Sequence, residues 1–268
     1  MKFSLLMSVY HKDSPIDFRE ALDSLVSSVV SPSEVVLVED GPLGAELQSV
    51  ISSFSDRLPI KNVKLTNNVG LGKALSFGLR ECSHEWIARF DSDDICHPAR
   101  FQTQLAFIKQ QKEIDIIGTA IAEFECSKAD VHAYRKPPIN HDEIVEYAKS
   151  RNQFNHMTVM YRKSKVLEAG SYQDNYLYED YALWVRMINN GAITANIPEV
   201  LVYARTGNGM EIRRGGLKYA RSESLAQLGF YKIGFINKRQ LCKNLLVRVP
   251  IRLASGRVRK LIYRKLLR

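Results

Sequence analysis

Short apolar runs alternate with segments of helical periodicity through the first half of the chain, and this alternation limits the fold more than any other feature. Residues 2–10, 34–38 and 85–90 are largely apolar runs of strand length. Residues 15–31 and 70–82 repeat apolar side chains at helical spacing. Strands that alternate with helices pair in parallel and form a sheet covered on both faces. We therefore predict an α/β fold.

Three of the predicted strands end in polar clusters. Ser8-Val9-Tyr10 closes the first strand, Glu39-Asp40 follows the second, and Asp91-Ser92-Asp93-Asp94 follows the strand at 85–90. Ligands of parallel sheets bind beyond the carboxyl ends of the strands. We therefore expect one site that is built from all three clusters.

The cluster Asp91-Ser92-Asp93-Asp94 places three carboxylates within four residues. Hard divalent cations such as Mg²⁺ and Mn²⁺ bind carboxylate oxygens, and phosphates and water complete their shell. Such an ion would offset the mutual repulsion of the three acids. The alternative is a solvated turn that caps the following helix, and we expect Asp94 to serve partly as that cap. The position at the end of a buried strand favours the metal.

Two further acidic pairs leave a binding and a structural interpretation open. Glu39-Asp40 can accept hydrogen bonds from a nucleobase or ribose, or form an Asx turn with Gly41. Glu179-Asp180 opens a predicted helix, where acids suit the helix dipole and where a carboxylate can also act as a general base. His156 precedes a strand predicted at 157–161, and a lone histidine is more often structural than catalytic.

Several common chemistries lack their motifs. No G-x-G-x-x-G follows the first strand, the glycines at 70–73 lack the spacing of a phosphate loop, and no G-x-S-x-G or H-E-x-x-H occurs. The four cysteines have no paired spacing, which indicates neither a zinc site nor a disulfide framework and suits a reducing cytoplasm. Three arginines near the end of the last predicted strand are either surface charges or phosphate ligands: Arg205, Arg213 and Arg214.

These segments, taken in order, resemble the inverting family 2 glycosyltransferases with the GT-A fold. The resemblance rests on five motifs within residues 3–205: SLLMSVYHKDS, VVLVEDG, NNVGLGKALSFGL, ARFDSDDICHPARF and YEDYALWVRM. It implies a Rossmann-like, nucleotide-binding GT-A sheet that is mixed but mostly parallel and flanked by helices, in a domain over residues 1–212. Residues 1–125 would bind the nucleotide and residues 126–212 the acceptor, and a basic helical tail would follow over 213–268.

On the nucleotide side, the resemblance implies that the loops after the first, second and fourth strands hold a UDP-sugar. Uracil would contact Ser8, Tyr10 and Asp40. Mn²⁺ or Mg²⁺ would bind Asp93 together with the diphosphate, and Asp91 would contact the ribose or the metal. The full set of nucleotide residues implied in this way is Ser8, Tyr10, Glu39, Asp40, Lys73, Asp91, Ser92 and Asp93.

On the acceptor side, the resemblance implies that Asp180 is the catalytic base, that Glu179 is its neighbour, and that His156 lies near the acceptor hydroxyl or the leaving phosphate. The implied reaction moves one glucose or galactose from a UDP-sugar, with inversion, to a polyprenyl-diphosphate-linked saccharide. An N-acetylhexosamine acceptor and a β-linkage are favoured, in bacterial O-antigen (lipopolysaccharide) or capsule biosynthesis. The membrane spans and the Gln-x-x-Arg-Trp motif of processive members are missing here, so we expect one sugar per encounter.

The positive charge is concentrated at the C-terminal end. The net charge is +9, and twelve of the 38 lysines and arginines but none of the 29 acids follow Glu223. Basic and apolar residues alternate there, and Pro250 and Ser255-Gly256 are expected to divide the tail into short helices. A basic amphipathic tail suits an anionic membrane surface, so we predict a cytoplasmic enzyme that is peripheral on the inner face of the cell membrane. A helical face packed on the domain is the structural alternative.

Two other function classes remain open at this point. A non-catalytic sugar-nucleotide or glycan-binding protein on the same fold would not need Asp180. A nucleic-acid-binding protein would use the basic charge, but this charge is confined to the tail, where base-stacking aromatic residues are scarce. We therefore expect no nucleic acid among the partners.

Overall fold

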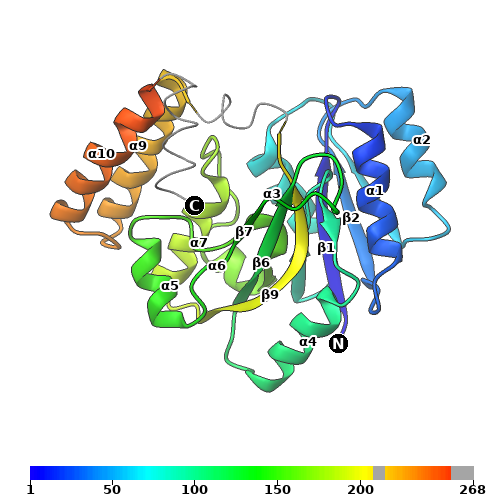
Figure 1. The fold of residues 1–268 in the computed structure, drawn as a ribbon, viewed down its shortest axis with the longest axis horizontal. Helices are drawn as coiled ribbons and strands as arrows, with labels where there is room; N and C mark the ends of the chain where they lie inside the picture. The colour runs from blue at the N-terminus through cyan, green and yellow to red at the C-terminus, as the bar shows by residue number, and fades with distance from the viewer. Residues whose placement is uncertain (208–214, 255–268) are drawn as a thin grey trace.

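The strands expected from the apolar runs join one sheet in the computed structural model, which describes residues 1–207 and 215–254. Helices lie on both faces of this sheet, and a pair of C-terminal helices lies at one side (Figure 1). Within the described residues the strand order is β3-β2-β1-β4-β8-β6-β9-β5, with β7 paired to β6. The strands are β1 (Phe3–Val9), β2 (Glu34–Glu39), β3 (Ile60–Lys64), β4 (Trp86–Arg89), β5 (Ile95–Cys96), β6 (Ile116–Phe124), β7 (Ala133–Arg135), β8 (Met160–Arg162) and β9 (Thr194–Arg205).

The parallel half of the sheet gathers the polar clusters at one edge. β1 lies between β2 and β4, β3 adds to β2, and all these neighbours run in parallel. The register sets Val9 beside Glu39 and Leu6 beside Arg89. Because carboxyl ends of parallel strands share one edge of a sheet, the segments that follow β1, β2 and β4 lie together.

The other half of the sheet is mixed. β8 runs antiparallel between β4 and β6, β9 runs parallel to β6, and β5 runs antiparallel to β9. The strand predicted at 157–161 was placed too early, because His156–Thr158 form a 3-10 turn, η1, and the pairing begins at Met160. The mixed, mostly parallel α/β sheet flanked by helices is otherwise as predicted.

Two apolar cores separate the sheet from its helices. One core lies under α1 (Pro15–Val26), α2 (Ala45–Ser53) and α4 (Arg100–Gln110). The other lies under α3 (Leu71–Glu81), α5 (His141–Ala148), α6 (Lys163–Glu168) and α7 (Glu179–Asn189). Each large apolar side chain buried there stabilises the fold by about 1.5–3 kcal/mol. The packing is close enough that a Cβ on Gly78 of α3 would lie 2.5 Å from a methyl group of Val38 in β2.

The described part of the C-terminal tail is a helical hairpin that packs on the domain. The hairpin consists of helices α9 (Leu217–Lys232) and α10 (Lys238–Leu253). The Gly216 N–H, just before α9, donates to the Arg252 carbonyl near the end of α10 at 2.9 Å. Tyr181, Phe230 and Leu241 belong to a third apolar core that joins this hairpin to α7. In Figure 1 the two helices lie beside α7 and α5. The structural alternative for the tail therefore holds for residues 215–254.

The expectation that Pro250 would break the tail is wrong. Pro250 lies inside α10, which continues to Leu253. The proline removes one helical N–H donor, but the helix continues for three more residues before it ends. The break expected at Ser255-Gly256 and the rest of the tail lie outside the described residues. Every helix within the described part of the chain is too short or too polar to cross a membrane.

Candidate active site

Hydrogen bonds tie the loop after β1 to the loop after β4. The Asp13 carboxylate accepts one hydrogen bond from the Tyr10 backbone N–H at 3.1 Å and another from the Ser92 hydroxyl at 2.9 Å. Ser8, also predicted to bind the nucleotide, is half-buried near the end of β1. The register of β1 and β4 therefore brings Tyr10 and Ser92 together through Asp13, an aspartate that the sequence analysis did not single out.

Three carboxylates crowd this junction, those of Asp13, Asp91 and Asp93. Burial, partly opposed by its hydrogen bonds, raises the pKa of Asp13 to about 6. Asp93 reaches the surface, yet surrounding protein atoms limit its hydration, and this, followed by repulsion from Asp91 and Asp13, raises its pKa to about 7. The folded protein thus resists a full set of negative charges here. A cation would offset that cost.

Asp94 has a different role from the one predicted. It is 2% exposed, and its Oδ1 accepts a hydrogen bond from the Arg205 backbone N–H at 2.8 Å. Burial, followed by repulsion from Asp93, raises its pKa well above the usual range. The expected helix cap is wrong, because α4 begins at Arg100 behind Ala99 and has no side-chain cap. Asp94 instead joins the acidic loop to the end of β9.

Arg205 is engaged by acids on the protein itself. Its Nε lies 3.3 Å from Asp17 Oδ1, its Nη2 lies 2.5 Å from Glu20 Oε2, and its guanidinium stacks 4.7 Å from the Phe124 ring centre. The side chain is only 7% exposed. A phosphate would have to displace these partners, so we do not carry Arg205 forward as a phosphate ligand. Arg213 and Arg214 lie outside the described residues.

A buried arginine underlies the acidic junction. Arg89, at the end of β4, is 1% exposed and donates to Asp91 Oδ1 at 2.5 Å and to the Leu6 carbonyl at 3.4 Å. Its charge also acts on His156 and Glu179. Arg89 therefore links the acidic loop to His156 and Glu179. A charged residue inside the apolar run at 85–90 was the signal in the sequence that could have identified it.

The pair Glu39-Asp40 organises the neighbouring loop. The Asp40 carboxylate accepts from the Val69 N–H at 2.7 Å and the Gly70 N–H at 3.1 Å, and its Oδ2 accepts from Asn68 Nδ2 at 3.1 Å. Gly41 has a φ of +88°, and a Cβ there would lie 2.7 Å from the Asn68 backbone nitrogen. Only glycine allows this approach. A uracil contact with Asp40 would have to share a carboxylate that already holds residues 68–70.

Glu39 is equally enclosed, at 3% exposure. Its Oε2 accepts from Gln48 Nε2 at 2.6 Å, and Lys64 Nζ lies 3.6 Å from its Oε1. Both contacts come from elements that flank β2. Glu39, one of the nucleotide residues that the resemblance implies, is thus held by side chains of the protein itself.

The start of α3 contacts the segment that precedes α7. Lys73 Nζ lies 2.7 Å from Asp174 Oδ2, with both side chains well exposed. A Cβ on Gly72 would lie 2.7 Å from the Gln173 carbonyl oxygen and 3.0 Å from Glu179 Cβ. Lys73 therefore stands where residues 1–125 meet residues 126–212.

His156 is neutral at physiological pH. Burial, followed by the charge of Arg89, lowers its pKa to about 4. Its Nε2 lies 3.2 Å from the Tyr172 hydroxyl, and its ring stands edge-on to Trp184. A neutral imidazole can hydrogen-bond to a hydroxyl or a phosphate oxygen without adding charge.

Glu179 and Asp180 lie in the first turn of α7, near His156. Asp180 Oδ2 accepts from Asn152 Nδ2 at 2.7 Å, and Asp180 Oδ1 accepts from the Tyr181 N–H at 2.6 Å. Burial, followed by repulsion from Asp180, raises the pKa of Glu179 to about 7. Asp180 and Asp91 both act on His156 electrostatically, so the acidic loop and the α7 start share one neighbourhood.

The structure thus adds several residues to the predicted site. Asp13, Asn152 and Tyr172 were missed because each has a partner distant in the sequence and a single polar residue carries no motif, whereas Arg89 was missed although it interrupts an apolar run. Within residues 1–207 and 215–254, no three His, Cys, Asp or Glu side chains are grouped to hold a metal ion by themselves.

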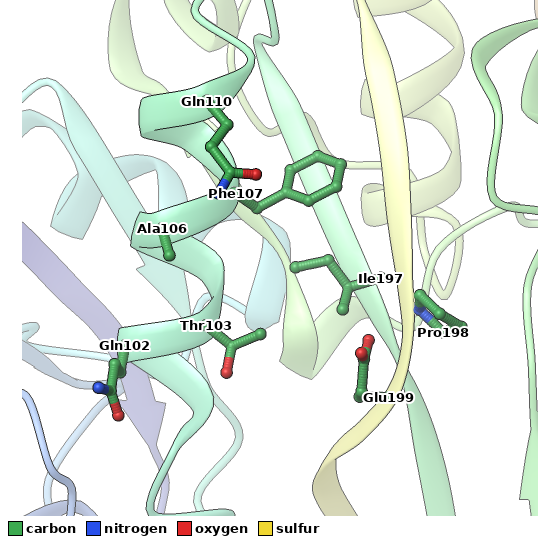
Figure 2. A pocket seen from close by; sticks show the side chains of 8 residues that line it. All are labelled: Gln102, Thr103, Ala106, Phe107, Gln110, Ile197, Pro198 and Glu199. Atoms are coloured by element: carbon green, nitrogen blue, oxygen red, sulfur yellow. The ribbon is translucent and has the colours of Figure 1, made fainter.

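A separate open pocket of about 420 Å³ lies between α4 and the first part of β9 (Figure 2). None of the candidate site residues lines it. Its walls are Gln102, Thr103, Ala106, Phe107, Gln110, Ile197, Pro198 and Glu199.

Comparisons in sequence identify relatives along the whole chain. The family described as "Glycosyl transferase family 2" matches residues 4–170. A Haemophilus influenzae glycosyltransferase is 43% identical over 268 residues and is covered completely, as is this chain. The Escherichia coli UDP-Gal:alpha-D-GlcNAc-diphosphoundecaprenol beta-1,3-galactosyltransferase is 41% identical, over 100% of this chain and 97% of the relative.

Comparisons in structure agree on the fold. The Staphylococcus aureus TarS fragment 1–349, solved with UDP-GlcNAc, matches 91% of this chain and 70% of that one, with a TM-score of 0.70 and 17% identity. The mannosyltransferase PcManGT from Pyrobaculum calidifontis, solved with GDP-Man and Mn²⁺, matches 99% of this chain and 75% of that one, with a TM-score of 0.66 and 13% identity. The chain is a glycosyltransferase of the GT-A fold and belongs to glycosyl transferase family 2.

Proposed function

We propose that this chain transfers one hexose, galactose before glucose, from a UDP-sugar to an N-acetylhexosamine on a polyprenyl diphosphate. The product would be a β-linked disaccharide in the assembly of a bacterial surface polysaccharide. The support is the E. coli relative, which is 41% identical over nearly its whole length and whose name states this donor and acceptor chemistry. The structural observation that most supports this proposal is the position of Asp180, which Asn152 holds near the acidic loop.

Asp180 would act as the general base. A sugar hydroxyl is a weak nucleophile near neutral pH, so a carboxylate that removes its proton assists the attack on the anomeric carbon. The attack and the departure of UDP would be in line on opposite faces, which inverts the configuration. No carboxylate nucleophile is needed, because a single displacement forms no glycosyl-enzyme bond.

His156 and Glu179 would complete the acceptor side. A neutral His156, already close to the Tyr172 hydroxyl, can hydrogen-bond to the acceptor or to a departing phosphate oxygen. Glu179, with a pKa raised to about 7, can hold a proton near neutral pH and donate a hydrogen bond to a sugar hydroxyl.

The acidic loop fits a divalent cation that is shared with the donor. Its side chains offer carboxylate oxygens, which suit Mg²⁺ or Mn²⁺. The pKa of Asp93 is raised by limited hydration and then by repulsion from Asp91 and Asp13, and a cation would offset both. Asp93 and Asp91 would hold the ion, and diphosphate oxygens would supply further ligands, consistent with the lack of a ready three-ligand group in the described chain. Such an ion stabilises the negative charge that develops on the departing diphosphate.

Residues 1–125 would bind the nucleotide and residues 126–212 the acceptor. Tyr10 and Ser92 are joined through Asp13 at the edge of the sheet, which supports a donor site there. Asp180, Glu179 and His156 come from the second part. Lys73, beside Asp174, would lie near the nucleotide where the two parts meet.

The exposed side of the α9–α10 hairpin would contact the anionic inner face of the cell membrane. Leu217 and Leu246 are 80% and 77% exposed, which is unusual for leucine, and exposed basic residues lie on the same two helices. Further exposed members of this surface are Leu225, Leu228, Val247 and Leu253, with Arg221, Lys232, Lys238, Arg239 and Lys243.

A charge-reversal variant tests the membrane contact without deleting packed helices. The triple variant K238E/R239E/K243E should lose flotation with phosphatidylglycerol vesicles. The matched triple K112E/K128E/K136E, whose lysines are exposed elsewhere, should float as the wild type does. Unchanged flotation of the first variant would contradict the contact.

A UDP-release assay tests the reaction. The wild type is incubated with Mn²⁺, a panel of UDP-sugars and a lipid-diphosphate N-acetylglucosamine acceptor. UDP-galactose should give the fastest acceptor-dependent release and a β-linked product. No acceptor-dependent release with any donor would overturn the proposal.

A further inference from the structure

A buried carboxylate in the hairpin holds the residue directly before Glu179. Glu223 of α9 is completely buried, and its oxygens lie 2.6 Å from Arg248 Nε and 3.1 Å from Arg252 Nη2. The Tyr178 hydroxyl donates a hydrogen bond to Glu223 Oε2. Tyr178 is the N-cap residue of α7, so this bond fixes the point where the helix that carries Asp180 begins.

The same helix also holds Tyr176, two residues before Tyr178. The Ser222 hydroxyl donates to the Tyr176 carbonyl, and Lys218 Nζ lies 4.0 Å from the centre of the Tyr176 ring. Leu177, between these anchors, has a φ of +60°. That conformation costs a leucine on the order of 1 kcal/mol and persists only where neighbours impose it. The contacts from α9 account for a backbone that is bent into α7 at this point.

The second helix of the hairpin holds the other segment that contacts Asp180. Asn244 Nδ2 donates to the Lys149 carbonyl at 2.8 Å, and Arg248 donates to the Ser150 carbonyl. Two residues later, Asn152 donates to Asp180. Because Arg248 also pairs with Glu223, it links the contacts that hold Tyr178 to the contacts that hold the segment before Asn152.

We infer that the α9–α10 hairpin positions the catalytic base, with Tyr178 and Asn152 as positioning residues that act through Asp180. The inference rests on the proposed role of Asp180. A base must be held within about 0.5 Å of its productive position, and a side chain at the first turn of a helix has little support from the helix itself. Here the contacts from α9 fix the start of α7 at Tyr178. The contacts from α10 fix the segment that carries Asn152, which holds the Asp180 carboxylate.

The test compares Tyr178→Phe and Asn152→Ala with matched controls. Tyr231→Phe changes a 42% exposed tyrosine of α9, and Asn189→Ala removes a hydrogen bond from α7 to the Ile233 carbonyl, at the far end of α7 from Asp180. Each positioning variant should lower kcat at least tenfold and change the Kd of UDP less than twofold. The controls should stay within twofold of the wild type in both. A purely structural role would lower kcat in Asn189→Ala as well, or would follow the loss of Tm in all four variants, and either result overturns the inference.

A double-mutant cycle with Asp180→Asn separates this inference from the proposed function. If Tyr178 acts through Asp180, Tyr178→Phe should change the residual transfer rate of Asp180→Asn less than twofold. A further tenfold loss in that background would show that Tyr178 acts independently and would overturn the inference alone. Full transfer by Asp180→Asn would instead overturn the role of Asp180 as base, and the inference with it.

Discussion

Two groups of acidic side chains in this protein have opposite electrostatic states. In the hairpin, burial alone would raise the pKa of Glu223, but Arg248, the Tyr178 hydroxyl and Arg252 hold it below its usual range. At the edge of the sheet, burial and like charges raise the pKa of Asp93 and of Glu179 to about 7. The first group has its counter-charges within the fold. The second has more carboxylates than the nearby basic groups of the protein can neutralise.

The difference distinguishes a structural ion cluster from a site whose charges are balanced only when a ligand binds. A buried carboxylate with two arginines is complete without substrate, so its value lies in fixing the geometry of its neighbours. Carboxylates with raised pKa values cost folding free energy until a cation, a proton or a substrate hydroxyl joins them. Each prediction below changes one of these acids or, at Asp180, the direct neighbour of one.

Asp180→Asn should have the largest effect on catalysis. Loss of a general base lowers a rate by about 10²- to 10⁴-fold, so kcat for transfer should fall within that range while UDP binding is retained. Steady-state transfer and calorimetric titration with UDP measure the two quantities. Asp130→Asn, an exposed loop change, serves as the control and should keep full activity.

Glu223→Gln should cause the largest loss of stability. Removing the charge leaves the buried Arg252 and the partly buried Arg248 without their counter-ion, which costs about 3–5 kcal/mol. Urea unfolding at pH 7 measures this loss, and the exposed change Glu113→Gln should leave the unfolding free energy within about 0.5 kcal/mol of the wild type.

The pH dependence of that loss has a definite sign. The folded pKa of Glu223 lies below the unfolded value of 4.5, so its contribution is complete above pH 4.5 and is lost as the pH falls through the folded pKa. The gap between Glu223→Gln and the wild type should therefore narrow in acid. A gap that widens below pH 4.5 would contradict this assignment.

Glu179→Gln should stabilise the protein at alkaline pH. The folded pKa of about 7 exceeds the unfolded value of 4.5, so ionised Glu179 costs stability, and that cost grows from pH 4.5 to pH 7 and is then constant. After allowance for partial exposure, we expect a gain of about 1–2 kcal/mol at pH 8. Thermal unfolding should show the gain vanish near pH 4.5. The exposed change Glu168→Gln should show no such trend.

Asp93→Asn should have the smallest free-energy effect and act on the donor. Loss of one metal ligand should weaken UDP binding in the presence of Mn²⁺ about tenfold, or about 1.4 kcal/mol, and change binding without metal less than twofold. Titration with UDP in Mn²⁺ and in EDTA measures both. Equal weakening in the two buffers would exclude Asp93 as a metal ligand, and Asp56→Asn, exposed on another loop, controls for loss of charge.

Some of the site was predictable because local patterns carried it. The apolar runs at 2–10, 34–38 and 85–90 predicted β1, β2 and β4, and parallel pairing then required the polar clusters to share an edge. The acids at the start of α7 were visible in the same way, as a pair that opens a periodic segment. The chemistry assigned to them came from the resemblance.

Other residues were misjudged because one polar side chain has many possible partners. Asp94 seemed a helix cap, since a helix follows it, but its partner Arg205 stands 111 residues away. Arg205 was predicted to be either a surface charge or a phosphate ligand, and the end of β9 brings it to Asp17 and Glu20 on α1. Neither contact has a signature in the chain near these residues.

The sequence by itself determined which segments pair in parallel, and therefore which ends of strands form a site, because hydrophobic periodicity is a local property. It also determined that the C-terminal charge is positive. Only the tertiary structure decided that this charge is partly turned inward, where Arg248 and Arg252 surround Glu223 and reach Tyr178. The physical reason is that a buried charge is acceptable only beside its counter-charge, and the fold alone sets which counter-charge is near.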